Sequence, residues 1–64
     1  MNIIKYYNLL VEYFEVAGAK KELRKLLNLI EEDESKAVVY CVYRGIKADD
    51  VKAMKEVIEK ILED

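Results

Sequence analysis

The chain has 64 residues, of which 53% are apolar and 38% are charged, a composition that predicts one small folded domain over residues 1–64 and excludes a disordered chain. No apolar run approaches the ~20 residues of a membrane span, and the sequence shows no basic-then-apolar pattern of a signal peptide. We therefore expect no membrane contact and, for a natural protein, a cytoplasmic location. A net charge of −2 points to no nucleic-acid or membrane partner, and one cysteine without any histidine excludes an internal disulfide and the usual zinc sites.

The first segment has a helical period. Its polar residues Lys5, Asn8, Glu12 and Glu15 are spaced three, four and three apart, which places them on one narrow stripe of a helix. Nearly all other positions of this segment are apolar. We therefore predict a helix over about residues 2–16, ended by a left-handed Gly18.

The second segment predicts an amphipathic helix over about residues 19–32, with leucines on one face and basic residues opposite. Asp33 or Ser35 can cap the helix that follows. The last segment predicts a helix over about residues 49–63, capped by Asp49 or Asp50.

The third segment is ambiguous. Its run of Val, Tyr and Cys favours a strand by propensity, but no other stretch of the chain offers a matching partner strand. We favour a short buried helix over about residues 34–44, ended by Gly45. The predicted fold is therefore an all-α bundle of four short helices. The alternative is an α+β protein in which residues 36–44 form a strand that pairs across a dimer.

The first helix carries a wide apolar arc of about 240°, whereas a surface helix usually buries an arc of about 100–140°. Its side chains either lie at the centre of the bundle or include a patch for another chain. The predicted interface consists of Tyr6, Leu9, Tyr13 and Val16. A second copy is the simplest partner for it, because most oligomers are symmetric homo-oligomers.

Other groups of residues give weaker indications. A basic face of the second helix could follow a phosphate backbone, although no aromatic residue lies among its bases; it consists of Lys20, Lys21, Arg24 and Lys25. Cys41 lacks a base that would activate it, so we interpret it as a small buried hydrophobe. Glu12 and Glu15 lack the histidine that helical di-metal sites need, so we interpret them as part of a solvated stripe.

The sequence therefore predicts no catalytic residue, cofactor, metal ion or small-molecule substrate, and no stretch matches a family motif. We expect a non-enzymatic structural or interaction module that self-associates through the first helix. The alternatives are a designed helical bundle without biological activity and a small nucleic-acid-binding protein. Abundant Lys and Glu are typical of thermostable chains, natural or designed.

Overall fold

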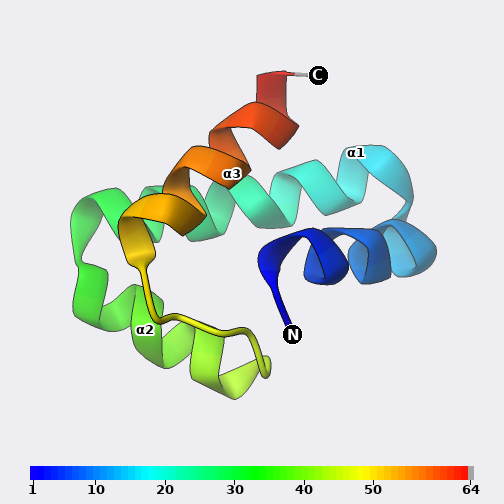
Figure 1. Ribbon diagram of the computed structural model, residues 1–64. Helices are drawn as coiled ribbons and strands as arrows, with labels where there is room; N and C mark the ends of the chain where they lie inside the picture. Colours follow the sequence, from blue (N-terminus) through cyan, green and yellow to red (C-terminus); the bar gives the residue numbers. More distant parts are fainter. Residues whose placement is uncertain (64) are drawn as a thin grey trace.

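The computed structural model describes residues 1–63 and shows three helices: α1 (Ile3–Glu32), α2 (Glu34–Tyr43) and α3 (Val51–Glu63) (Figure 1). The described residues contain no strand, so the all-α prediction is confirmed. The strand alternative for residues 36–44 is wrong, because Lys36 to Tyr43 belong to α2 and Arg44 lies in the following turn. The number of helices also differs from the prediction, because the first two predicted helices form the single element α1.

α1 is sharply kinked at Glu15, whose backbone angles φ 64° and ψ 179° are not helical. We call residues 3–14 the N-terminal arm and residues 16–32 the C-terminal arm. The chain reverses direction at the kink, and both arms contribute to one hydrophobic core (Figure 1). At 100° per residue, the buried side chains of the two arms would point about 160° apart on a straight helix. The break is therefore what allows both arms to face the same core.

The kink lies three residues before the predicted helix end at Gly18. Gly18 is inside α1, and a Cβ added there would lie 2.5 Å from the Cβ of Phe14. The glycine is therefore required for close packing of the two arms at the kink, whereas the positive φ falls on Glu15.

The remaining helix ends follow the predicted signals. Asp33 Oδ1 accepts the Ser35 N–H at 3.0 Å, and Asp50 Oδ1 accepts the Ala53 N–H at 3.1 Å. At the end of α2, Gly45 has a positive φ of 69°, its N–H bonds to the Val42 carbonyl, and the Ile46 N–H bonds to the Cys41 carbonyl. This pair of bonds forms a Schellman motif, in which glycine avoids the cost of a left-handed Cβ.

The core lies on α1. Both α2 and α3 pack mainly against this helix, and the fully buried side chains of α1 are Ala19, Leu23 and Leu26. The N-terminus is held to the α2–α3 loop by two hydrogen bonds, from the Met1 ammonium to the Gly45 carbonyl and from the Lys47 N–H to the Met1 carbonyl. The other buried side chains are Ile3, Tyr6, Leu10, Ile30, Ala37, Cys41, Ile46, Met54 and Ile58.

Replacing Glu15 with glycine should stabilise the domain. The backbone angles of Glu15 fall in a region that is open almost only to glycine and costs other residues about 1–3 kcal/mol. Glycine removes this strain but loses more backbone entropy on folding, so we expect the free energy of unfolding to rise by about 1 kcal/mol. The measurement is the free energy of unfolding in urea. Glu15→Ala removes the same exposed carboxylate but retains Cβ, so it should change stability little. Equal gains from both variants would show that the charge, and not the backbone, is responsible.

Candidate functional site

The structure separates Tyr6 from the rest of the predicted interface. Tyr6 is only 6% exposed and belongs to the core, so its assignment to an accessible patch is wrong. Burial raises the pKa of the Tyr6 hydroxyl to about 12; the Tyr40 side chain adds to the rise, and the Arg44 guanidinium opposes it. The Arg44 guanidinium carbon lies 3.7 Å from the centre of the Tyr40 ring, a cation–π geometry. Tyr6 therefore belongs to the core that the N-terminal arm shares with α2 and α3.

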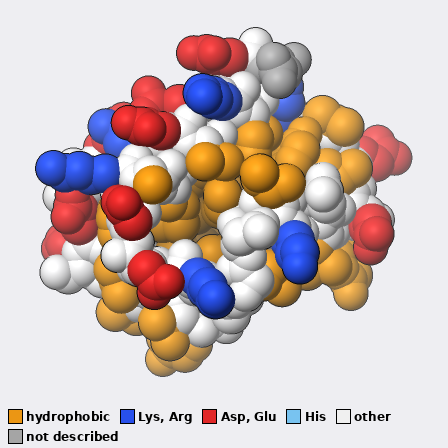
Figure 2. Space-filling model, in the orientation of Figure 1, with side chains coloured by type: hydrophobic (Ala, Val, Ile, Leu, Met, Phe, Trp, Pro, Cys, Tyr) orange, Lys and Arg blue, Asp and Glu red, His pale blue; other side chains and the backbone are white. Residues whose placement is uncertain are grey.

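The other three predicted interface residues reach the surface. Leu9 is 38% exposed, Tyr13 75% and Val16 50%. Phe14, which sequence reasoning did not select, is 56% exposed, and its ring centre lies 6.3 Å from that of Tyr13. We call Leu9, Tyr13, Phe14 and Val16 the arm surface. Hydrophobic side chains are visible beside the kink of α1 at the right of Figure 2.

A second apolar surface lies on α2. Val39, Val42 and Tyr43 are 55%, 69% and 84% exposed and occupy neighbouring positions on one side of the helix. We call these three residues the α2 face; hydrophobic side chains gather below α2 at the lower left of Figure 2. Sequence reasoning placed this segment in the core, although the spacing of three and four already marks one helix face.

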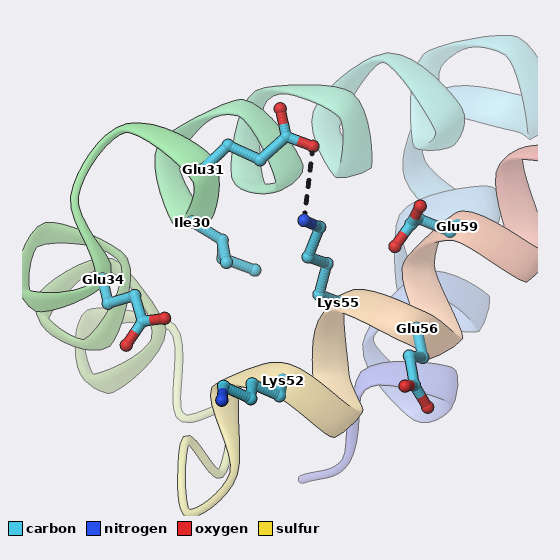
Figure 3. A pocket seen from close by; sticks show the side chains of 7 residues that line it. All are labelled: Ile30, Glu31, Glu34, Lys52, Lys55, Glu56 and Glu59. Carbon is cyan, nitrogen blue, oxygen red and sulfur yellow. Dashed lines mark ion pairs between the residues drawn. The ribbon is translucent and has the colours of Figure 1, made fainter.

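An open groove of about 620 Å³ lies between the end of α1, the start of α2 and one side of α3 (Figure 3). One ion pair joins its walls, between Lys55 Nζ and Glu31 Oε1 at 3.7 Å. Ile30 is its only apolar lining residue, so the groove offers little contact to an apolar ligand. The charged lining residues are Glu31, Glu34, Lys52, Lys55, Glu56 and Glu59.

The basic residues predicted on the second helix all lie on the C-terminal arm of α1. Lys21, Arg24 and Lys25 are exposed, whereas Lys20 is half-buried. Lys25 Nζ pairs with Glu22 Oε1 at 3.3 Å, which partly neutralises this face.

The other candidate groups, Cys41 and the Glu12–Glu15 pair, lie in environments that do not favour catalysis or metal binding. Cys41 is fully buried, with its Sγ 3.8 Å from the Met54 Sδ, and burial raises the pKa of its thiol. A neutral thiol is a poor nucleophile. Glu12 and Glu15 are both exposed. Residues 1–63 contain no cluster of three or more side chains suited to a metal ion, and none of their helices is long and apolar enough to cross a bilayer.

No protein-family model, curated protein or solved structure matches the chain significantly.

Proposed function

We propose that this protein is a non-enzymatic interaction module that self-associates through the arm surface of α1. The observation that carries the proposal is the exposure of Leu9 and Tyr13, which are four residues apart and therefore adjacent on the helix. Neither Leu9 nor Tyr13 belongs to the hydrophobic core or to the partly buried side chains packed against it, so these two side chains have no role in the monomer core.

The chemistry of the arm surface fits a protein partner. Tyr and Phe are enriched in the centres of protein interfaces, where large rings bury much area with little loss of side-chain entropy. The N-terminal arm has 12 residues and is therefore about 18 Å long, so the contact is smaller than a standard interface. We expect weak association, with a dissociation constant in the range of about 10 μM to 1 mM.

The decisive variant combines Leu9→Glu with Tyr13→Lys. It should remain folded but become monomeric, because it introduces charges where the second copy would have to bury them. Sedimentation of both proteins from about 10 μM to about 1 mM gives the oligomeric state, and a thermal melt of the same samples reports folding.

The α2 face provides the matched control. Val39→Glu with Val42→Lys places the same pair of charges on exposed positions of α2 and should leave self-association unchanged. Loss of self-association only in this control would assign the contact to α2 instead. A wild-type protein that is monomeric at about 1 mM would contradict self-association altogether.

A further inference from the structure

Charged side chains flank Leu9 on the N-terminal arm in a pattern that is complementary to itself. Lys5 and Glu12 are both exposed and lie about 10 Å apart along the N-terminal arm. In helical projection both lie within about 60° of Leu9, so all three share one face of the arm. Within residues 1–63, neither Lys5 nor Glu12 forms an ion pair.

We propose that two copies pair through their N-terminal arms in antiparallel orientation about a two-fold axis near Asn8 and Leu9. This inference rests on the proposed self-association and specifies its geometry. Lys5 lies as far before this midpoint as Glu12 lies after it. A two-fold axis repeats every contact, so each Lys5 faces Glu12 of the other copy and two ion pairs form. Leu9 lies between these pairs, opposite Asn8 of the second copy and next to Leu9 of that copy.

A parallel arrangement would give the opposite electrostatics. It would place Lys5 against Lys5 and Glu12 against Glu12, and like charges in apposition weaken an interface. The α2 face shows no comparable complementarity, because Lys36 is the one charged residue of α2 within about 90° of this face in helical projection, and Glu34 lies on another side of the helix. The charges of the arm therefore favour both this surface and this orientation.

Charge reversal tests the pairing directly. Lys5→Glu and Glu12→Lys should each weaken the dimer by about tenfold, because each converts two attractions into two repulsions. The double variant, Lys5→Glu with Glu12→Lys, should recover the wild-type dissociation constant because it restores opposite charges in both pairs. A mixture of the two single variants should form a heterodimer more tightly than either forms a homodimer.

The control is Lys21→Glu, which changes the net charge as Lys5→Glu does but at an exposed residue of the C-terminal arm. Its dissociation constant should stay within about twofold of the wild-type value. Sedimentation at about 20 mM and about 500 mM salt should show the tenfold effects shrinking at high salt. Two results would contradict the antiparallel pairing but leave self-association intact. In the first, the wild type associates and the double variant has a dissociation constant as high as those of the single variants. In the second, the single variants have the same dissociation constant as the wild type. A wild type that does not associate contradicts both proposals.

Discussion

Replacing Tyr6 with lysine should destabilise the domain by at least about 3 kcal/mol, whereas replacing Tyr13 with lysine should change its stability by less than about 0.5 kcal/mol. Both changes remove a tyrosine from the same arm of α1 and add the same charge. The difference is burial, because Tyr6 is 6% exposed and Tyr13 is 75% exposed. A buried ammonium would lose its hydration without gaining a carboxylate partner.

Urea denaturation followed by circular dichroism at low micromolar concentration measures both free energies on the monomer. Tyr6→Phe retains the buried ring, adds no charge and nearly conserves volume, so it should lose no more than about 1.5 kcal/mol. If Tyr6→Lys were as stable as Tyr13→Lys, the N-terminal arm would not pack on the core through Tyr6.

The second large effect is expected at Leu26, which is fully buried in the C-terminal arm. Leu26→Ala removes core contacts and leaves a cavity, so we expect a loss of about 2–5 kcal/mol. In a domain of this size each 1 kcal/mol lowers the melting temperature by about 4–8 °C. Leu9→Ala is the control at a 38% exposed position and should cost less than about 1 kcal/mol. Equal losses from the two variants would mean that the two leucines are equally buried.

Local sequence signals predicted the helical content and several helix ends well. The stripe of Lys5, Asn8 and Glu12 faces solvent as expected, and this spacing has no counterpart in a strand. Asp33 and Asp50 cap helices because their short carboxylates reach free backbone N–H groups. These features depend on residues close in sequence, so they can be inferred without knowledge of the tertiary structure.

Tertiary contacts decided the features that the sequence did not predict. The chain breaks at Glu15, an unfavourable residue for a positive φ, because the core faces of both arms must meet. Tyr6 is buried in a core that it shares with residues of α2 and α3, and a projection of α1 alone does not reveal this. Similarly, α2 packs through Ala37 and Cys41, both fully buried, and leaves the larger Val39, Val42 and Tyr43 exposed. Small residues allow two helices to approach closely, so the segment predicted as a buried helix buries only one face and exposes the other.

The arrangement of α2 and α3 around α1 has a consequence for local opening. The two outer helices pack mainly on α1, and a specific side-chain contact between them joins Cys41 to Met54. Either outer helix can therefore detach while the other keeps most of its contacts, but neither can remain docked once the C-terminal arm of α1 unfolds. Amide hydrogens around Leu23 and Leu26 should then exchange with solvent only through global unfolding, whereas those of α2 and α3 can exchange through smaller, independent openings.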